Sequence, residues 1–520
     1  MRIYHFLDFW AREQPDAEFA VQESQSLTYA EAAAAVNRLA NGIVRSGVQV
    51  GERVAILAPN RPELVLIMLA AAKAGVVAVP MDSRQTPNQW QYVINDGQIK
   101  SLFSAGEFVP AVDELRQSLE TVEHFIAIDD VDGASGWESY GDWLVDQPAT
   151  PIERPVADTD PLYQIYTSGT TGAPKGVVVS HGASMALLMQ VNLMFPTQPG
   201  DRFMVVTPIF HVSGLVSSFF CVYAGGSIYL PRGFDPVEAV RALSEERITG
   251  TTMVPAMIQA CLAVPGAAER RYDSLRAIAY GAAAIAVETL KRATQVFPCG
   301  FLQAYGLTEA LPVTWLTIQD HQIALTGKPE LLASAGRPAL ATEVRIVDEE
   351  GQPVPTGSLG EIIVSGPGLM TEYWNRPEAT AETLRDGWLY TGDAGYLDEE
   401  GYLFIRDRIK DLILWSGRNV YPQMVEDVLA NHPAVMEAAV IGVPDPVTGE
   451  AVKAVVMLRE GMSAAPKELI DFCAESLAEY QRPSSVEFVD SFPRNVLGKV
   501  LKRQLREPYW AGQERRVGTA

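Results

Sequence analysis

The feature that most restricts the fold of this chain is an alternation of apolar helical stretches with short strands rich in β-branched residues. Three such pairs are "EAAAAVNRLANGIVRSG" with "RVAIL", "ELVLIMLAAAKAG" with "VVAVP", and "DPVEAVRALSEER" with "TTMVP". Repeated alternation of this kind is typical of parallel sheets that are covered by helices. The sequence therefore predicts an α/β protein, and its 520 residues favour more than one domain.

The pattern of predicted helices and strands changes twice along the chain. From about residue 341, "EVRIVDEEGQPVPTGSLGEIIVSG" reads as strands separated by Gly and Pro turns, which favours a β-rich, antiparallel subdomain over residues 341–409. After "GYLFIRDRIKDLI", the pattern is helix, two strands and a second helix, a compact α+β unit. We expect a large N-terminal domain of several subdomains over residues 1–409 and a small α+β C-terminal domain over residues 410–520.

Charge and composition exclude several classes of protein. The formal net charge of −23, with no Lys/Arg run, argues against nucleic acid as a partner. The run "LVLIMLAAAKAGVVAVP" is interrupted by Lys73 and Gly75 before it reaches the ~20 residues that span a bilayer, and no secretory signal is evident. We expect a cytoplasmic protein without a transmembrane segment, and we leave a homodimer open. The cysteines have apolar neighbours and no paired spacing, which favours buried, reduced thiols: Cys221, Cys261, Cys299 and Cys473.

A loop rich in hydroxyl groups and glycines lies at residues 166–181, "YTSGTTGAPKGVVVSH". Its backbone N–H groups, its hydroxyls and the ammonium of Lys175 suit an anion rich in oxygens, such as phosphate. The flanks "LYQIY" and "VVV" read as strands, whereas a Walker A loop opens a helix. A kinase would need His-Arg-Asp and Asp-Phe-Gly further on, and neither occurs. We interpret the segment as a phosphate-binding loop between two strands.

Four further motifs follow this loop in order. They are "AYGLTE" at residues 304–309, "YTGD" at residues 390–393, "RDRIKDLILWSGRNVYP" from Arg406 and "PRNVLGKVLKR" from Pro493. With the loop, they resemble the core motifs of the adenylate-forming superfamily, which includes acyl-CoA synthetases, adenylation domains of peptide synthetases and luciferases, over nearly the whole chain. The resemblance implies an N-terminal domain that binds AMP and acyl groups, a mobile C-terminal domain, and the conversion of a carboxylate and ATP into acyl-AMP and pyrophosphate.

The resemblance also implies roles for individual residues of the N-terminal domain. Glu309 would hold Mg²⁺ together with Thr167, and Thr308 would lie beside it among the catalytic groups. Adenine would lie between Tyr305 and the backbone of "GAAA" at residues 281–284. The nucleotide-binding residues of this domain would be Thr167, Ser168, Gly169, Thr170, Thr171, Gly172, Lys175, Gly281, Ala282, Ala283, Ala304, Tyr305, Gly306 and Thr308.

The same resemblance assigns roles near the C-terminal domain. Asp393 and Arg408 would bind the ribose. Lys499 would be the catalytic lysine, whose ammonium bridges the carboxylate of the acid and the α-phosphate. Lys410 matches a hinge about which the domain swings between adenylation and thioester formation. In the second orientation the "WSGRNVYP" face, with Gly417 and Arg418, would meet CoA, although many relatives have a smaller residue at the position of Arg418.

The acid is predicted to be hydrophobic. Peptide-synthetase domains carry an Asp in the segment that matches "PIFHVSG", where this chain has His211, so an amino acid is not expected. The stretches "LVSSFF", "MVPAM" and "EALPVT" contain no Arg or Lys that could pair with a second carboxylate. His211 matches the aromatic gate between the acyl pocket and the pantetheine tunnel of acyl-CoA synthetases.

We therefore expect an AMP-forming acid:CoA ligase that uses ATP, Mg²⁺ and CoA. Its substrate would be a hydrophobic monocarboxylic acid, with medium- or long-chain fatty acids ahead of aryl acids such as cinnamate, coumarate, ferulate or benzoate. Two alternatives remain: a stand-alone adenylating enzyme that loads a separate carrier protein, and a non-catalytic acyl or nucleotide sensor. The "YDSLR" segment at residues 272–276 contains the triplet of carrier domains but lacks their Gly pair, and we interpret it as a turn.

Overall fold

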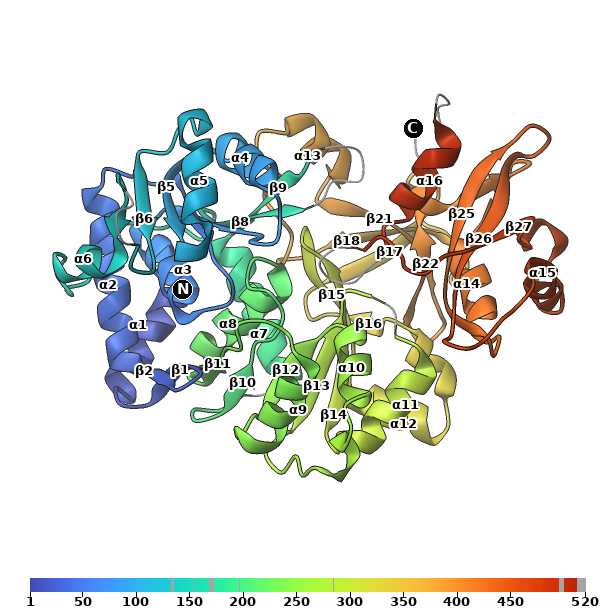
Figure 1. Ribbon diagram of the computed structural model, residues 1–520, viewed down its shortest axis with the longest axis horizontal. Helices are drawn as coiled ribbons and strands as arrows, with labels where there is room; N and C mark the ends of the chain where they lie inside the picture. The colour runs from blue at the N-terminus through green and yellow to red at the C-terminus, as the bar shows by residue number, and fades with distance from the viewer. Residues whose placement is uncertain are drawn as a thin grey trace. The chain divides into compact units, whose positions relative to one another are not determined.

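The computed structural model describes residues 1–131, 135–152, 154–167, 173–195, 197–283, 285–494 and 500–511 (Figure 1). The chain forms two compact units. The first consists of Met1–Glu343 and Ser365–Leu389, and the second of Val344–Val364 and the chain from Tyr390 onward. The predicted α/β class, with a large unit built on parallel sheets and a smaller unit at the C-terminal end, is confirmed. The domain limits at residues 409 and 410 stay a prediction.

A nine-stranded sheet lies in the first unit. Its central strands are parallel, and antiparallel strands extend both edges. Helices flank it, as the alternating sequence predicts (Figure 1). In spatial order the strands are β16 (Arg337–Pro338), β15 (Ala310–Leu316), β14 (Gly300–Leu307), β13 (Ala277–Gly281), β12 (Gly250–Met253), β10 (Arg202–Met204), β11 (Ser227–Tyr229), β1 (Glu18–Gln22) and β2 (Gln25–Thr28).

An eight-stranded sheet lies beside it in the same unit. Most of its strands are parallel, while β9 runs antiparallel to β8 and β19 antiparallel to β9. In spatial order the strands are β19 (Glu372–Tyr373), β9 (Lys175–Ser180), β8 (Pro161–Thr167), β4 (Val77–Met81), β3 (Arg53–Leu57), β5 (Ile99–Ser104), β6 (His124–Ala127) and β7 (Glu138–Ser139).

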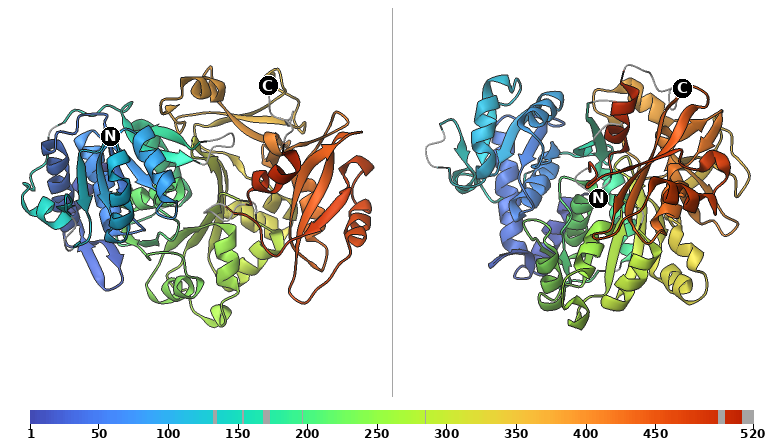
Figure 2. Two further views of the ribbon diagram at one scale, coloured as in Figure 1. Left: turned by 45° about the horizontal axis from the view of Figure 1, so that its top comes forward. Right: turned by 45° about the vertical axis from the view of Figure 1, so that its right-hand side comes forward.

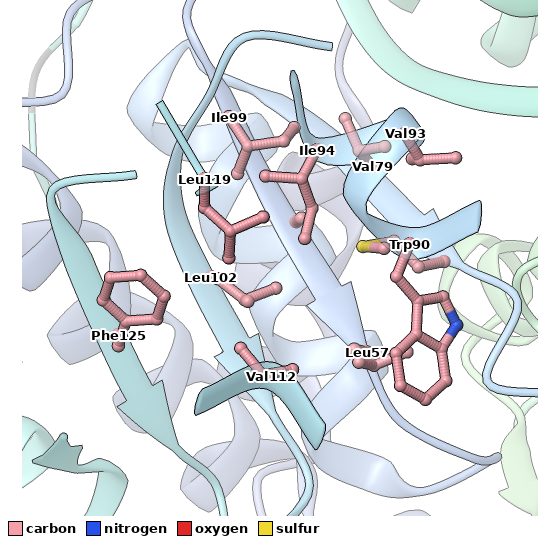
Figure 3. Packing of buried hydrophobic residues seen from close by; sticks show 12 residues of the cluster. Leu57, Val79, Trp90, Val93, Ile94, Ile99, Leu102, Val112, Leu119 and Phe125 are labelled. Atoms are coloured by element: carbon pink, nitrogen blue, oxygen red, sulfur yellow. The ribbon is translucent and has the colours of Figure 1, made fainter. Parts of the chain in front are cut away.

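One face of the eight-stranded sheet is covered by the helices α4 and α5. Side chains from the two helices and from β3, β4, β5 and β6 pack into one apolar cluster (Figure 3). Trp90 and Ile94 of α4 and Leu102 of β5 are among its buried members. This packing holds α4, and with it the C-terminal end of that helix, firmly against the sheet that carries the phosphate loop.

The helices of the first unit begin and end where local chemistry favours it. At the start of α2, Thr28 accepts a hydrogen bond from the backbone N–H of Glu31, whose carboxylate accepts one from the backbone of Thr28. The helices are α1 (Ile3–Glu13), α2 (Tyr29–Arg45), α3 (Pro62–Ala74), α4 (Pro87–Asp96), α5 (Val109–Leu115), α6 (Tyr140–Val145), α7 (His181–Met194), α8 (Val212–Ala224), α9 (Pro236–Glu245), α10 (Pro255–Leu262), α11 (Val287–Val296), α12 (Ile318–Thr326) and α13 (Pro377–Thr383).

The longest apolar run of the sequence forms a buried helix followed by a buried strand. Residues 64–74 of α3 are all buried, and the helix ends at Gly75, whose φ of 70° requires the left-handed region that glycine adopts readily. The chain then enters β4, all of which is buried. Among the helices of the described residues, none has both the length and the apolar character needed to cross a membrane.

The described residues of the second unit form two sheets and three α-helices. One sheet contains β17 (Glu343–Val347), β18 (Gly360–Ser365), β21 (Trp388–Leu397) and β22 (Leu403–Arg408). The other contains β24 (Arg418–Val420), β23 (Ile413–Trp415), β26 (Gly449–Leu458), β25 (Val435–Asp445) and β27 (Ser485–Phe488), orange to dark red in Figure 2. The helices are α14 (Pro422–Ala430), α15 (Pro466–Ala474) and α16 (Lys502–Trp510). The predicted order of helix, two strands and helix is confirmed.

Two smaller expectations are also settled. All four cysteines are free, and three are buried while Cys299 is only partly buried, so the expectation of burial was wrong for Cys299 alone. Within "YDSLR", Asp273 and Ser274 form a turn before β13, as predicted.

Candidate active site

The phosphate loop connects two antiparallel strands of the first unit, as predicted. Thr167 at the end of β8 pairs with Lys175 at the start of β9, and Tyr166 pairs with Gly176. A Cβ atom at Gly176 would lie 2.6 Å from Nε2 of Gln164, which explains the glycine at this position. Five loop residues with predicted roles lie outside the described residues: Ser168, Gly169, Thr170, Thr171 and Gly172.

Glu309 lies in a tight hairpin turn. It occupies that turn with Thr308, and β14 and β15 pair on either side of it. The predicted nucleotide-binding residues Ala304, Tyr305 and Gly306 belong to β14 just before the turn. The hairpin therefore presents "AYGLTE" as one short, partly exposed stretch of backbone and side chains.

Tyr373 contacts both the predicted phosphate lysine and the predicted metal ligand. Its hydroxyl donates a hydrogen bond to Oε1 of Glu309 at 2.8 Å. Nζ of Lys175 lies 4.7 Å from the centroid of its ring, within the range of a cation–π contact. Tyr373 itself is buried on β19, which pairs with β9. The fold thus places Lys175 and Glu309 around a single aromatic side chain.

Sequence reasoning missed Tyr373. It lies in "TEYWNRP", where its strand is only two residues long and gives no periodic signal. The position of this segment beside β9 is a tertiary feature, since almost 200 residues separate the two strands. The only hint in the sequence is that two aromatic residues, Tyr373 and Trp374, stand side by side shortly before Arg376.

The oxygen ligands at this place suit Mg²⁺. Mg²⁺ usually takes one or two carboxylates from the protein and completes its shell with water and substrate phosphates. Glu309 supplies a partly exposed carboxylate, and Thr167 ends the strand that leads into the phosphate loop. The described residues contain no group of three or more His, Cys, Asp or Glu side chains that could form a closed metal cage. A metal bound here would therefore depend on the phosphates of the substrate, and the ligand roles remain predictions.

The predicted adenine segment begins where two backbones approach closely. Gly281 at the end of β13 pairs with Ala304 of β14, and a Cβ atom at residue 281 would lie 2.4 Å from the Ala304 carbonyl oxygen. The next residue, Ala282, has a φ of 65°, in the left-handed region that non-glycine residues rarely adopt. Ala282 and Ala283 are exposed, whereas residue 284 lies outside the described residues.

His211 is the N-cap residue of α8 in the first unit. Burial lowers the pKa of its imidazole to about 4, so the ring is neutral at pH 7. Within the described part of the chain, its buried Nε2 atom has no hydrogen-bond partner. Its ring centroid lies 5.0 Å from that of Phe210. His211 is thus an uncharged aromatic side chain at neutral pH, and Asp82 and Arg84 lie near enough to influence its pKa.

In the second unit, the two residues that are predicted to bind the ribose, Asp393 and Arg408, lie next to each other. Asp393 and Arg408 face each other on β21 and β22, and Nε of Arg408 lies 2.6 Å from Oδ1 of Asp393. Only 4% of Asp393 is exposed, and Gly392 before it has a φ of 69°. Two predicted ribose ligands are therefore adjacent and oppositely charged.

The remaining predicted residues also belong to the second unit. Lys410 lies in a single 3₁₀ turn, Ile409–Asp411, directly after β22. Gly417, with a φ of 78°, turns the chain between β23 and β24. The exposed Arg418 places its guanidinium 5.3 Å from the ring centroid of Tyr480. Lys499 lies outside the described residues, so its catalytic role stays a prediction.

Comparisons with known proteins identify the family of this chain. The family model described as AMP-binding enzyme matches residues 7–374, and the model described as AMP-binding enzyme C-terminal domain matches residues 424–499. The chain is 36% identical over 98% of its length to a fatty acid–[acyl-carrier-protein] ligase, ScoC, of Streptomyces coeruleorubidus, covering 96% of that protein. It is 36% identical to a feruloyl-CoA synthase of an Amycolatopsis species, over 96% of this chain and 97% of that one.

Among solved structures, ATP-bound MatB from Rhodopseudomonas palustris superposes with a TM-score of 0.88 at 29% identity, covering 98% of this chain and 99% of that one. The ordered motifs, the sheets and both family models therefore agree. The chain belongs to the family of AMP-binding enzymes, the adenylate-forming superfamily that its motifs resemble.

Proposed function

We propose that this protein is an ATP-dependent, AMP-forming acid:CoA ligase acting on a hydrophobic monocarboxylic acid. The observation that carries the proposal is the contact of Tyr373 with both Lys175 and Glu309 beside the phosphate loop. A cation for phosphate and a carboxylate for Mg²⁺ at one place suit a reaction that expels pyrophosphate. The family and the named ligases among its relatives support the same enzyme class.

The first half-reaction would join the acid to AMP. A carboxylate oxygen of the acid attacks the α-phosphorus of ATP, the bond from that phosphorus to the β-bridging oxygen breaks, and pyrophosphate leaves with the electron pair. Lys175 and the loop would hold the β- and γ-phosphates, where negative charge accumulates. Mg²⁺, held by Glu309 and Thr167, would neutralise part of that charge when it is bound. Lys499 would stabilise the charge between the carboxylate and the α-phosphate.

The second half-reaction would transfer the acyl group to CoA. The thiol sulfur attacks the acyl carbon, the bond from that carbon to the AMP oxygen breaks, AMP leaves, and the thiol proton passes to solvent. Asp393 and Arg408 are proposed to bind the ribose. Lys410 is proposed to be the hinge between the two half-reactions, and Gly417 and Arg418 are proposed to belong to the face that meets CoA.

Several features support a hydrophobic acid. His211 is neutral at pH 7, because burial lowers its pKa to about 4, and so it offers no charge to a second carboxylate. Residues 214–222 of α8 are all buried, and Ser217 joins this helix to Thr252 of β12 by a hydrogen bond of 3.2 Å. We place medium- or long-chain fatty acids ahead of aryl acids, while the relatives named above act on one or the other.

A second candidate function is the loading of an acyl-carrier protein. It is favoured by one observation, the 36% identity to ScoC, whose acceptor is a carrier protein. The chemistry up to acyl-AMP would be the same, and only the thiol acceptor would differ. We further propose a cytoplasmic location, supported by the four free cysteines, and a homodimer, which light scattering after size exclusion would test.

The proposal is tested by offering purified protein ATP, Mg²⁺ and CoA with a panel of acids. The panel contains fatty acids of increasing length, cinnamate-like and benzoate-like acids, a dicarboxylate and amino acids. We expect acyl-CoA from the hydrophobic monocarboxylates only, and loss of about 10²-fold or more of this activity in Glu309→Gln. Turnover with the dicarboxylate or an amino acid would contradict the acid class. No acid-dependent pyrophosphate release from any acid would contradict the enzyme and favour a sensor.

A further inference from the structure

One cluster of hydrogen bonds around Asp96 holds both ends of the phosphate loop. Asp96 is the last residue of α4, and only 11% of its side chain is exposed. Its two carboxylate oxygens accept from different partners, Tyr166 on one and Arg376 on the other. Its backbone carbonyl accepts from the indole N–H of Trp374 at 3.0 Å. Of the residues that make these contacts, only Tyr166, the first residue of the loop segment, belongs to a nucleotide-binding motif.

The strand that enters the loop is fixed by Tyr166. The tyrosine hydroxyl donates to Oδ2 of Asp96 at 2.7 Å and accepts from Nε2 of Gln164 at 3.0 Å. Tyr166 directly precedes Thr167, the last described residue before the loop. A rotation of this end of β8 would therefore break a hydrogen bond to a charged group, the stronger kind of hydrogen bond in proteins.

The strand that leaves the loop is fixed by Tyr92. Its hydroxyl donates to the carbonyl oxygen of Pro174 at 3.0 Å, one residue before Lys175. The same hydroxyl accepts from a guanidinium nitrogen of Arg376 at 3.1 Å, and this nitrogen also donates to Oδ1 of Asp96 at 2.6 Å. Tyr92 and Asp96 are four residues apart and lie on the same face of α4. One helix end thus contacts both arms of the hairpin.

The charges of the cluster are compatible with the anionic ligand that the loop is proposed to hold. A lone carboxylate close to a triphosphate would repel it, whereas Arg376 offsets the charge of Asp96. Burial and the neighbouring Asp96 raise the pKa of Tyr166, so its hydroxyl remains a donor at neutral pH. Arg53 stacks on Trp374 with its guanidinium carbon 3.2 Å from the ring centroid, which supports the segment that carries Arg376.

We propose that Asp96 is a positioning residue for ATP: with Tyr166, Tyr92 and Arg376 it sets the spacing of the two loop arms and thereby the affinity for the β- and γ-phosphates. The inference rests on the proposed function only in taking ATP as the ligand of the loop. Asp96 touches no substrate in this scheme. Its effect should therefore be confined to ligands that carry those two phosphates.

The test measures binding of ATP with Mg²⁺, and of AMP, to the full chain by calorimetry without any acid. Asp96→Asn is expected to weaken ATP binding about 10- to 100-fold, and Tyr166→Phe about fivefold, because the first removes charged hydrogen bonds and the second a single one. AMP affinity should stay unchanged in both variants, since AMP lacks the β- and γ-phosphates. In a double-mutant cycle, Asp96→Asn and Arg376→Gln should be less than additive.

Matched controls remove comparable contacts elsewhere in the first unit. Asp8→Asn removes a partly exposed carboxylate that accepts from Lys73 at 2.7 and 2.9 Å, and Tyr272→Phe removes a buried hydroxyl that donates to the Ala267 carbonyl at 2.7 Å. Both controls should bind ATP and AMP as the unmodified protein does. Equal loss of ATP and AMP affinity in Asp96→Asn, or no loss in folded Tyr166→Phe, would overturn the inference and leave the proposed function standing. An unmodified protein that does not bind ATP would overturn both.

Discussion

Two charged clusters in this molecule, one in each unit, are built in different ways. In the first unit, the cluster at the phosphate loop consists of Asp96, Arg376 and tyrosine hydroxyls, and Arg376 keeps 39% of its side chain exposed. In the second unit, the cluster next to the turn Ile409–Asp411 holds three carboxyl groups and two basic groups largely out of solvent. Its members are Asp407, Asp411, Glu426, Lys502 and Arg506.

The second cluster joins three separate elements by ion pairs. Nζ of Lys502 lies 2.7 Å from Oε1 of Glu426, which links α16 to α14. Arg506 of α16 lies 2.7 Å from Oδ1 of Asp411, in the turn that follows β22. Burial alone would lower the pKa of Lys502, but Glu426 and Asp407 outweigh it and raise the pKa, so Lys502 stays charged at neutral pH. The segment that follows Lys499 is thereby tied to the turn that contains Lys410.

Because the two clusters are built differently, we expect one to affect ligand binding and the other to affect stability. Neutral hydroxyls and one half-exposed ion pair can orient a loop without dominating the free energy of unfolding, since exposed ion pairs contribute little. A buried group of ions is different, because removing one partner leaves an uncompensated charge inside the protein. We therefore expect changes in the first cluster to alter ATP affinity and changes in the second to alter the stability of the second unit.

The largest effect on stability is expected for Lys502→Met. It removes the cation that faces Glu426 and Asp407, and should destabilise the second unit by about 3 kcal/mol. Hydrogen exchange of peptides from α14 and β25 measures this unit by itself. As the control, Lys453→Met removes a lysine whose partner, Glu487, is 45% exposed, and should have a much smaller effect. Equal losses of stability in the two variants would show that the buried cluster contributes no more than a partly exposed ion pair.

A smaller effect, which depends on pH, is expected for Asp411→Asn. Burial alone would raise the pKa of Asp411, but Arg506, Lys502 and Lys410 outweigh it and lower the pKa. A carboxyl whose pKa is lowered on folding contributes stability above its unfolded pKa of about 3.9 and loses it as the pH falls through the lower folded value. We expect a loss of about 2 kcal/mol at pH 7 that shrinks in this acidic window. If the difference in exchange protection between the variant and the unmodified protein stayed constant down to pH 3, the ionised form of Asp411 would not be the source of this stability.

Arg376→Gln should hardly change the stability of the first unit. The arginine of its ion pair with Asp96 is 39% exposed, and Asp96, which is 11% exposed, keeps the hydrogen bonds from Tyr166 and Trp374. We therefore expect a loss below about 1 kcal/mol. Exchange protection of β8 and β9 checks this, alongside the ATP affinity of the same preparation. Global loss of protection in the first unit would show that the cluster is structural and would remove the contrast.

The smallest effect is expected for Ala282→Gly, and it has the opposite sign. Ala282 has a φ of 65°, where glycine avoids a penalty of about 1–2 kcal/mol but loses more entropy on folding, so a net gain of about 0.5 kcal/mol remains. This position carries backbone strain and no charge, so it tests whether a local change near the predicted adenine segment acts independently of Asp96. Thermal unfolding compares the variant with Ala283→Gly, for which no gain is expected. A destabilised Ala282→Gly would mean that the left-handed conformation is not strained.

Much of this organisation could be predicted from the sequence, because it depends on local patterns. The buried run of α3 and β4, the strands on either side of the phosphate loop and the order of elements in the second unit follow from periodicity and turn residues. The family motifs implied that Asp393 and Arg408 bind the same ribose, but they did not predict the ion pair between the two side chains.

The two charged clusters could not be predicted in the same way, because their partners are distant in the sequence. Asp96 resembles an ordinary helix-end residue until the fold brings Tyr166 and Arg376 to it, across 70 and 280 residues. Lys502 resembles a surface lysine in "VLKRQLRE", and its interactions with Glu426 of α14 and Asp407 of β22 arise only from the tertiary fold. Burial of a charged group depends on tertiary packing, which local sequence does not encode.

The fate of the acyl group in a single reaction distinguishes CoA from a carrier protein as the acceptor. Purified protein receives ATP, Mg²⁺ and a fatty acid, with either CoA or a phosphopantetheinylated acyl-carrier protein as the thiol. We predict that acyl-CoA, AMP and pyrophosphate form in equal amounts, and that CoA is consumed at the rate of pyrophosphate release. Pyrophosphate release that leaves CoA intact, with the acyl group found only on the carrier protein, would rule out CoA as the acceptor and identify a carrier-loading enzyme.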